Sequence, residues 1–361
     1  MAERERFDSY LDPAGTRALC ERILTGAGLP ADQSAVVVDN LVRADLRGIS
    51  SHGISRMAVY TGRVASGGLS TDGRIEIVSD APAAMRIDAR NNMGAVAGTQ
   101  AMRLVIERAR TCGIAAATVF NGNHYGFAAY YSMMALESDM IGVALSNAPP
   151  TMAPWGGMAP MMGTNPFSIA APAAKHRPLV LDCASSYVAR GKINLADIEK
   201  KPIPEGWALD ADGHSTTDAA AALAGVVLPF GTYKGSGIAI MIDVLSAVLS
   251  GASFGMHVGQ LYRDADTPQN LGHFFAAIHI GMLSDPVAFK AGVDQIVDDI
   301  KGSRKAPGTD EIFLPGELEF ENEIYYMKKG IGVGAGVLRD LRNLSQTYGD
   351  GTDPEILQKP E

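Results

Sequence analysis

The sequence predicts a mixed α/β fold, in which the strands of a sheet alternate with covering helices. Three observations support this prediction. From residue 113 onward, short apolar runs alternate with helical patterns and glycine-rich turns. Of the 361 residues, 47% are hydrophobic and 20% are charged. Glycine is frequent, with 40 residues, which indicates many tight turns or close backbone approaches.

The first part of the chain is predicted to be helical. Between residues 12 and 68, apolar residues recur three and four positions apart, as in SAVVVDNLVRADLRGI. Two strand-like runs follow, RIEIVSD and AAMRIDA, and then an apolar helix, VAGTQAMRLVIERAR. The chain therefore starts with helices and enters the sheet after about residue 74.

The remaining strands are predicted at residues 113–120, 141–148, 168–173, 179–185 and 273–281. The most apolar stretch, residues 237–254, is interrupted by Asp243 and three serines, so it predicts a buried helix rather than a bilayer span. After residue 301 we expect a polar loop, a short helix at 337–349 and a loose acidic tail. The glycine run at 330–335 lies too near the end for a dinucleotide-binding βαβ unit, so we interpret it as a turn.

Charge and cysteine content limit the possible partners. The formal net charge is −9, which argues against nucleic acid or an anionic membrane surface as the main partner. Three widely spaced cysteines and an N-terminus without an apolar core favour a cytoplasmic protein. His273 and His279 are interpreted as packing residues, and no metal site is predicted.

The segment RGISSHGISRMAVY, residues 47–60, contains the residues best suited to catalysis. His52, Arg56 and Tyr60 are each four positions apart, so a helix starting at Ser51 would place them on one face. A histidine exchanges protons near neutral pH, and an arginine binds a carboxylate through two hydrogen bonds. The alternative is an ordinary solvated helix face, capped by Ser50 or Ser51.

Further candidates follow predicted strands. The turn NGNHYG, residues 121–126, precedes a helix whose start could hold a phosphate, and the alternative is a tight turn with a structural His124. Asp182 lies at the carboxyl end of a predicted strand, which is the usual ligand edge of α/β sheets. Lys234 stands at the start of the apolar helix, where a cation is unfavourable unless an anion neutralises it.

Ten ordered motifs carry a resemblance to a known family. They are ADLRGISSHGISR, NHYG, APWGG, GTNPF, LDCAS, ARGKI, WALDADG, YKGSG, NLGHFF and LPGE. With these motifs the chain resembles the malate/L-lactate dehydrogenase family of the non-Rossmann type, whose members include malate, sulfolactate and ureidoglycolate dehydrogenases and piperideine-2-carboxylate reductases.

The resemblance implies hydride transfer between NAD or NADP and a small 2-oxo or 2-hydroxy acid. It implies a non-Rossmann mixed-sheet fold of the sulfolactate-dehydrogenase-like type, with an NAD(P)-binding domain at 113–301 and a connecting segment at 81–112. Residues 1–80 and 302–361 would form a helical dimerisation region. A homodimer is expected, with sites near the subunit interface.

The family's functional residues map onto this chain one by one. Ser51 and His52 match a serine–histidine pair, with His52 as the proton donor to the carbonyl oxygen, and Arg56 matches the substrate-carboxylate arginine. Thr164 matches a substrate contact, and Tyr60 stays a catalytic candidate because of its spacing from Arg56. In some members the histidine matching His124 is the acid/base instead. The residues that match cofactor contacts are His124, Tyr125, Gly126, Asp182, Cys183, Ala184, Arg190, Lys234, Pro315, Gly316 and Glu317.

Two departures from the family pattern narrow the substrate. Ureidoglycolate-type members have a lysine where this chain has Pro150, and imine reductases have an aspartate where it has Lys192. A 2-hydroxy acid such as malate, lactate or sulfolactate is therefore favoured. The alternatives are a cyclic-imine (piperideine or pyrroline-2-carboxylate) reductase and, in another class, a non-catalytic NAD(P)-binding assembly protein.

Overall fold

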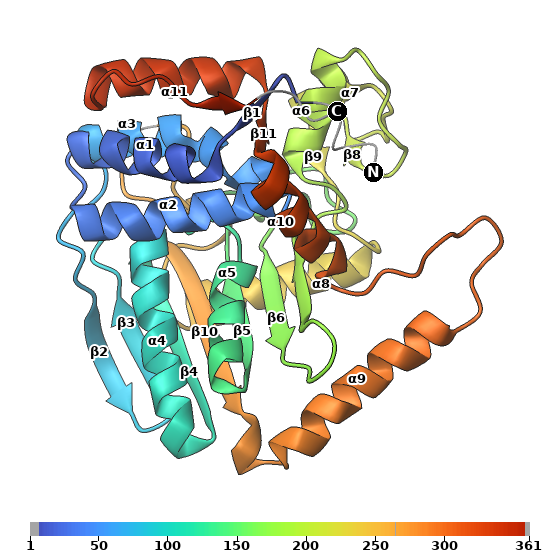
Figure 1. Ribbon diagram of the computed structural model, residues 1–361. Coiled ribbons are helices and arrows are strands. Elements are labelled where there is room, and N and C mark those ends of the chain that lie inside the picture. Colours follow the sequence, from blue (N-terminus) through green and yellow to red (C-terminus); the bar gives the residue numbers. More distant parts are fainter. Residues whose placement is uncertain (1–6, 264, 358–361) are drawn as a thin grey trace.

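The computed structural model describes residues 7–263 and 265–357. Its centre is a seven-stranded mixed sheet with the order β2-β3-β4-β10-β5-β6-β7 (Figure 1). The strands are β2 (Glu76–Ala81), β3 (Ala84–Asp88), β4 (Ile114–Gly122), β5 (Met140–Ser146), β6 (Phe167–Ala171), β7 (Leu179–Cys183) and β10 (Leu271–His279). Only β3 and β4 pair in parallel within this sheet, and the other neighbours are antiparallel. The mixed α/β prediction is confirmed, and the sheet lacks the parallel strand series of a Rossmann fold.

Helices cover both faces of this sheet. Helix α4 (Gly94–Cys112) connects the parallel strands β3 and β4 and packs in front of the sheet in Figure 1. Gly98 of α4 lies against Tyr131 and the fully buried Phe275 of β10. On the opposite face, the backbone of Ser246 approaches Gly272, which is an odd number of residues from Phe275 and so points the other way. Ser246 belongs to a π-helical turn, Val244–Val248, which continues helix α8 (Tyr233–Asp243).

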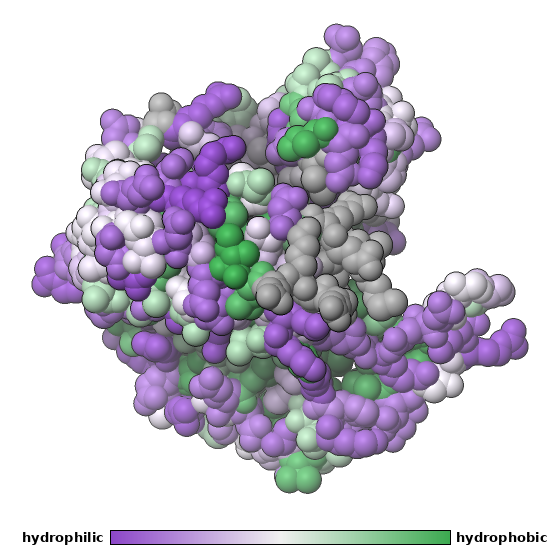
Figure 2. Space-filling model, turned by 45° about the horizontal axis from the view of Figure 1, so that its top comes forward, coloured by the Kyte–Doolittle hydropathy of each residue, from purple (hydrophilic) through white to green (hydrophobic). Residues whose placement is uncertain are grey.

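The chain ends form a separate helical layer. It contains α1 (Pro13–Gly26), α2 (Ala31–Leu46), α3 (Met57–Ala65), α10 (Glu317–Lys329) and α11 (Ala335–Tyr348). A small antiparallel sheet, β11-β1-β12, joins the ends through Ile331–Val333, Ser9–Leu11 and Ile356–Leu357. The layer has its own core, and hydrophilic side chains cover most of the face shown in Figure 2. The helical region built from the chain ends thus exists, whereas the domain boundaries at 80 and 113 stay a prediction.

Local sequence explains where α1 begins. The Asp12 side chain accepts the Gly15 N–H at 2.6 Å, and Pro13 occupies the first helical position, where no N–H is needed. Leu19 and Ile23 lie one turn apart and are both buried against α2. A cap and an apolar stripe therefore suffice to define this helix.

Three further parts complete the fold. A small unit contains α6 (Arg190–Ile198), α7 (Ala219–Ala224) and the paired strands β8 (Ala208–Leu209) and β9 (Val226–Val227), around a separate apolar cluster. Helix α5 (Ala129–Ser132) follows β4. Helix α9 (Pro286–Gly302) projects from the body, and a long loop returns from it to α10 (Figure 1).

The apolar stretch 237–254 differs from the prediction of a buried helix. Its first part is helical as α8 and the π-helical turn, but only one side is buried. More than a third of the side chain surface is exposed at Ile240, Met241, Val244, Val248 and Leu249. Within the described ranges, the structure contains no helix long and apolar enough to cross a membrane.

The C-terminal part also differs from its prediction. The polar segment after residue 301 is a loop only to about residue 316, because α10 follows it. The glycine run at 330–335 is not a simple turn, since Ile331–Val333 forms β11 against β1. The tail contributes β12 to the other side of β1. These short strands escaped prediction because their partner lies at the opposite end of the chain.

Replacing Phe275 by alanine tests the central core. The side chain is fully buried, so its loss leaves a cavity, and we expect the free energy of unfolding to fall by about 3–5 kcal/mol. Urea unfolding followed by circular dichroism measures this change. Val287→Ala on α9 is the matched control, because 72% of Val287 is exposed and the expected change is below about 0.5 kcal/mol. Equal effects of both substitutions would contradict the placement of the core.

Candidate active site

The segment that contains His52 and Arg56 is a bend rather than the predicted continuous helix. Two 3-10 turns, Ser50–His52 and Ile54–Arg56, flank Gly53, whose backbone is extended. The carboxyl group of Asp45 on α2 accepts the Ile54 N–H at 2.7 Å and prevents the helix from continuing through this point. The prediction of one helix face was therefore wrong in its geometry.

The bend nevertheless keeps the histidine and the arginine close together. The Arg56 Nε–H donates to the Ser51 carbonyl at 2.7 Å, which turns the guanidinium back toward His52. Ser51 Oγ lies 2.9 Å from His52 Nδ1, so the serine and the imidazole form a hydrogen-bonded pair. Tyr60 follows on α3 and is buried.

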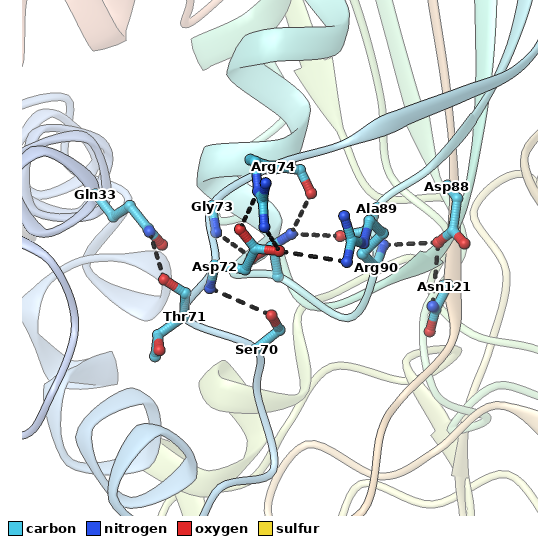
Figure 3. A network of polar contacts seen from close by, with 11 residues as sticks. Gln33, Ser70, Thr71, Asp72, Gly73, Arg74, Asp88, Ala89, Arg90 and Asn121 are labelled. Carbon is cyan, nitrogen blue, oxygen red and sulfur yellow. Dashed lines mark hydrogen bonds and ion pairs between the residues drawn. The ribbon is translucent and has the colours of Figure 1, made fainter.

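The second site segment is the turn after β4, which an asparagine-rich network supports. Asn121 has a positive φ of 54°, and its side chain donates to Asp88 at the end of β3. Figure 3 shows how Asp88 is joined through Arg90 to the loop that contains Asp72 and Arg74. These bonds hold the backbone on both sides of the turn and define the direction in which the chain leaves β4.

The turn itself presents His124 to the bend. Asn123 donates to the Asn91 side chain and to the Asn92 carbonyl, and the His124 N–H donates to Gln269 Oε1 at 3.0 Å. The imidazoles of His52 and His124 are stacked, with ring centroids 5.5 Å apart and an interplanar angle of 20°. Two segments far apart in the sequence therefore bring two imidazoles together.

The contacts of His124 Nδ1 define the tautomer of His124. The Tyr60 hydroxyl lies 2.6 Å from this nitrogen, and the Gly126 N–H also points at it, at 3.4 Å. Because a backbone N–H can only donate, Nδ1 is the acceptor and Nε2 has the proton. Tyr60 thus acts on His124, and its hydroxyl is already committed.

Burial keeps both imidazoles neutral. It lowers the pKa of His52 to about 3, with a further lowering by the Arg56 charge. Burial also lowers the pKa of His124 well below its ordinary value, and Arg56 contributes again. Conversely, burial raises the pKa of the Tyr60 hydroxyl. At neutral pH the only charge among these four side chains is the Arg56 guanidinium.

Arg56 has no acidic partner among residues 7–263 and 265–357. The guanidinium is half-buried, and the Tyr262 ring covers one of its faces. The Arg56 Cζ lies 5.3 Å from the centroid of that ring. Nε is bonded to the Ser51 carbonyl, and the remaining N–H groups are left for a ligand. A desolvated, unpaired guanidinium is costly, so this group is suited to an anion such as a carboxylate.

A second group of predicted residues surrounds the end of β7. The Val180 N–H donates to the Pro315 carbonyl at 3.0 Å, and Gly316 has a φ of +87° where a Cβ would clash with Val180. Glu317 accepts the Leu314 N–H at 2.9 Å and so closes this turn. The Pro315–Glu317 turn therefore lies directly beside the strand that ends at Asp182 and Cys183.

Ser185 links this strand end to two other predicted positions. Its N–H donates to the Thr164 carbonyl at 2.8 Å, and its carbonyl accepts the Phe230 N–H at 3.1 Å. Gly235 lies against the same carbonyl, which places Lys234 nearby at the start of α8. Ala184 connects Ser185 to Cys183, so Thr164, Lys234 and the strand end form one region.

Asp182 connects the two regions. It accepts the Ala129 N–H at 2.9 Å, directly after the turn that contains His124 and Tyr125. Burial raises the pKa of Asp182 to about 6. The suggested phosphate position at the start of the following helix stays a prediction, and α5 offers it little support because it has only four residues and its Ala129 N–H is already bonded to Asp182. Arg190 lies apart, in the small unit, and donates to the Leu223 carbonyl at 2.6 Å.

The surroundings of Lys234 suit an anionic ligand that has a planar ring. A cavity of about 480 Å³ opens beside Lys234 and Tyr233, and its walls are the apolar side chains Leu145, Phe167, Ile238, Met241, Ile242 and Leu245. Lys234 is exposed and forms no ion pair within the described ranges. The ammonium group of Lys234 can bind a phosphate, and the apolar walls beside it can cover a planar ring. The described residues contain no cluster suited to a metal ion.

Sequence reasoning missed three residues of this site, Asp45, Tyr262 and Gln269, and one contact, which His273 makes. The His273 ring stacks on Tyr125 with centroids 4.6 Å apart, and its Nδ1 lies 2.8 Å from Ser146 Oγ. His273 is fully buried, so its interpretation as a packing residue is confirmed. Asp45 lies inside the motif ADLRGISSHGISR, Gln269 directly precedes NLGHFF, and Tyr262 lies in none of the ten motifs, so no spacing rule pointed to these three side chains.

Comparison with known proteins gives one consistent family. The family model described as malate/L-lactate dehydrogenase matches residues 11–342. The malate dehydrogenase of Pyrococcus abyssi is 38% identical over 336 residues, which cover 91% of this chain and 92% of the relative. The solved sulfolactate dehydrogenase of Methanocaldococcus jannaschii superimposes with a TM-score of 0.89 at 37% identity, covering 94% of this chain and 97% of that one.

Relatives differ in the cofactor that their names give. The (2R)-3-sulfolactate dehydrogenase (NADP(+)) of Chromohalobacter salexigens is 35% identical, with 78% of this chain and 86% of the relative covered. The ureidoglycolate dehydrogenase (NAD(+)) of Escherichia coli is 33% identical, with coverages of 83% and 85%. The names of these two relatives therefore both give a nicotinamide cofactor, and the two cofactors differ in the additional phosphate of NADP.

The lowered pKa of His52 predicts that acid destabilises the fold through this side chain. In the folded protein the imidazole stays neutral down to about pH 3, whereas in the unfolded chain it binds a proton below about pH 6.5. The stabilising contribution is thus complete above about pH 6.5 and is lost as the pH falls toward 3. His52→Asn removes this linkage, so between pH 7.5 and 5.5 the variant should lose about 1 kcal/mol less unfolding free energy than the wild type.

Urea unfolding at the two pH values measures that difference. His257→Asn is the control, because His257 is exposed and should leave the pH dependence unchanged. An identical pH dependence for the His52→Asn variant and the wild type would show that His52 is not held neutral by burial.

Proposed function

The chain belongs to the malate/L-lactate dehydrogenase family and is a nicotinamide-dependent 2-hydroxy acid dehydrogenase, and we propose that it acts on a small acid of the malate, lactate or sulfolactate type, with His52 as general acid/base and Arg56 as the carboxylate clamp. The observation that supports this proposal most directly is the unpaired Arg56 guanidinium beside two neutral imidazoles. A 2-oxo acid has a carboxylate that Arg56 can bind. The adjacent carbon atom carries a carbonyl oxygen that a histidine can protonate.

Substrate binding changes the protonation of His52. Burial and then the Arg56 charge lower the pKa of the imidazole in the free protein, and a carboxylate bound to Arg56 offsets the second of these causes. The pKa of His52 is then raised, which favours the protonated imidazole that donates a proton to the carbonyl oxygen, and the neutral imidazole removes it in the reverse reaction. Ser51 holds the other ring nitrogen and keeps the imidazole in place.

His124 has a complementary part in this proposal. Tyr60 and Gly126 bind its Nδ1, so the proton on Nε2 is available as a fixed hydrogen-bond donor beside His52. A neutral imidazole of this kind stabilises the negative charge that develops on the substrate oxygen. In this arrangement His52 donates the proton, and the stacked His124 donates a hydrogen bond.

The cofactor is proposed to bind along the end of β7. When bound, a reduced nicotinamide supplies the hydride that the carbonyl carbon accepts. Tyr125, Gly126 and Asp182 lie between this region and the histidines, and Lys234 is suited to a phosphate. Cys183, Ala184, Arg190, Thr164 and the Pro315–Glu317 turn complete the proposed contacts, with Thr164 facing the substrate.

A kinetic panel tests the assignment of function and roles. We expect loss of reduced-nicotinamide absorbance with 2-oxo acids such as oxaloacetate, pyruvate and sulfopyruvate, measured with NADH and with NADPH. His52→Gln should lower turnover about 10²- to 10⁴-fold with unchanged cofactor affinity, because it removes only the proton donor. Unchanged turnover in His52→Gln and a loss in His124→Gln would transfer the acid/base role to His124.

Arg56→Lys tests the carboxylate clamp. Lysine keeps the charge but cannot form two parallel hydrogen bonds, so we expect KM for the 2-oxo acid to rise about 10- to 100-fold. Arg43→Lys is the matched control, because Arg43 pairs with Asp39 on α2 and lies outside the site. A wild-type KM in Arg56→Lys would rule the clamp out, and turnover of a cyclic imine alone would favour the reductase alternative.

The exposed side of α8 supports a homodimer as part of this proposal. Tyr233, Ile240, Met241, Val248 and Leu249 form an apolar strip that continues into the cavity beside Lys234. Contiguous apolar surface of this kind is typical of subunit interfaces. A partner seated on it would place a subunit boundary next to the proposed cofactor site.

Light scattering coupled to size exclusion tests the dimer. We expect twice the 38.0 kDa mass of the chain, and Ile240→Asp should reduce it to the monomer mass, because a charge cannot be buried without a partner. Val78→Asp on β2, at the other edge of the sheet, is the control and should leave the mass unchanged. A monomeric wild type would contradict the proposed dimer.

A further inference from the structure

Helix α2 contacts both turns of the site through two buried polar side chains. Asp45 accepts the Ile54 N–H at 2.7 Å, and Asn40 donates to the Tyr125 carbonyl at 3.2 Å. Both residues are at least nine-tenths buried. One helix therefore contacts the bend that contains His52 and the turn that contains His124.

The glycine at position 53 is explained by Asp45 and not by its own backbone angles. Gly53 has φ −89° and ψ −152°, which residues with side chains also adopt. A Cβ at this position, however, would lie 2.0 Å from Asp45 Oδ1 and 2.1 Å from its Cγ. Glycine is needed here because the carboxyl group occupies the space of a side chain.

The hydrogen bond to Asp45 satisfies a backbone N–H group that has no acceptor within the bend. The Gly53 N–H donates to Ser50 and the Arg56 N–H donates to Gly53, so each 3-10 turn closes its own bond. The Ile54 N–H lies between the turns, is buried, and has Asp45 as its acceptor. Without that acceptor the group would be unsatisfied, and the bend would shift to solvate it.

We propose that Asp45 is a positioning residue for the reaction, which fixes the relative placement of His52 and Arg56 by holding the Gly53–Ile54 link on α2. The inference rests on the proposed function of these two side chains. Asp45 is buried behind the bend, and its hydrogen bond goes to the backbone of Ile54. It acts because the imidazole lies on one side of the held link and the guanidinium on the other, and small displacements of reacting groups cost large factors in rate.

Asparagine is the conservative replacement at this position. Burial raises the pKa of Asp45 to about 8, so the side chain is uncharged in most molecules at pH 7. Asparagine keeps this neutrality, the shape and a carbonyl acceptor for the Ile54 N–H. Leucine has a similar size and no acceptor, so the pair separates the hydrogen bond from the packing.

Steady-state kinetics with the 2-oxo acid that the wild type reduces best tests the proposal. We expect Asp45→Leu to lower kcat/KM at least about 100-fold, through both a higher KM and a lower kcat, with an unchanged Kd for the reduced cofactor measured by its fluorescence. Asp45→Asn should recover most of the activity. Asp39→Leu is the matched control on α2, because Asp39 pairs with Arg17 and Arg43 and not with the bend, and its KM should stay at the wild-type value.

Wild-type kcat/KM in Asp45→Leu would overturn the proposal. Equal losses in Asp45→Asn and Asp45→Leu would also overturn it, because the acceptor would then be irrelevant. A parallel loss of cofactor affinity in Asp45→Leu would indicate general disruption and contradict a positioning role.

A double-mutant cycle tests the contact itself. Gly53→Ala places a methyl group on the Asp45 carboxyl, so we expect a strong loss of kcat/KM. In the Asp45→Ala background the carboxyl group is gone, and adding Gly53→Ala should change kcat/KM by less than about twofold. Additive losses would show that Gly53 is not constrained by Asp45. Gly62→Ala on α3 is the control, because a Cβ there meets nothing.

The placement of His52 can also be followed without turnover. The Cε1–H resonance of His52, assigned with His52→Asn, should move in Asp45→Leu and stay in place in Asp39→Leu. A wild type that reduces none of the 2-oxo acids would contradict the proposed function alone. An unmoved His52 resonance in Asp45→Leu would contradict the positioning role alone.

Discussion

Hydrogen bonds from the buried face of α2 to two separate backbone turns are the constraint on which the site depends. Asp45 binds the bend before α3, and Asn40 binds the turn after β4. Each bond contributes only about 1 kcal/mol net, but an unsatisfied buried group costs about 1–3 kcal/mol. A displaced turn would leave its buried polar group without a partner, which costs more free energy than the hydrogen bond contributes. The two hydrogen bonds therefore restrict the positions that the two imidazoles can adopt.

The site combines one permanent charge with two imidazoles that burial keeps neutral. Burial and, to a smaller extent, the Arg56 charge lower the pKa of both histidines, so Arg56 is the only positive charge among these three side chains at neutral pH. A single carboxylate changes this balance, because it neutralises Arg56 and makes protonation of a neighbouring imidazole favourable. In the proposed mechanism, electrostatics therefore couples carboxylate binding at Arg56 to proton transfer at His52.

The proposed cofactor site of this chain uses no glycine fingerprint of the Rossmann type. The candidate contacts come from the end of β7, the start of α8 and the turn before α10, which the Ser185 and Pro315 backbone bonds bring together. Hydrophobicity along the chain gives an incomplete picture of the same region. It predicts helix α8 but does not distinguish the face that packs on the sheet from the apolar face that stays exposed in the single chain.

The amino-acid sequence by itself determined the mixed α/β class, the main strands, the family and the residue types of the site, because alternating apolar runs, helical periodicity and motif order are local properties. His52, Arg56 and His124 could be chosen as candidates on these grounds. Only the tertiary structure decided that Gly53 bends the segment, that Tyr60 binds His124, and that the imidazoles stack. It also decided that β12 pairs with β1 and that α10 follows the C-terminal loop. These features depend on contacts between distant segments, and such contacts leave no periodic pattern in the sequence from which they could be predicted.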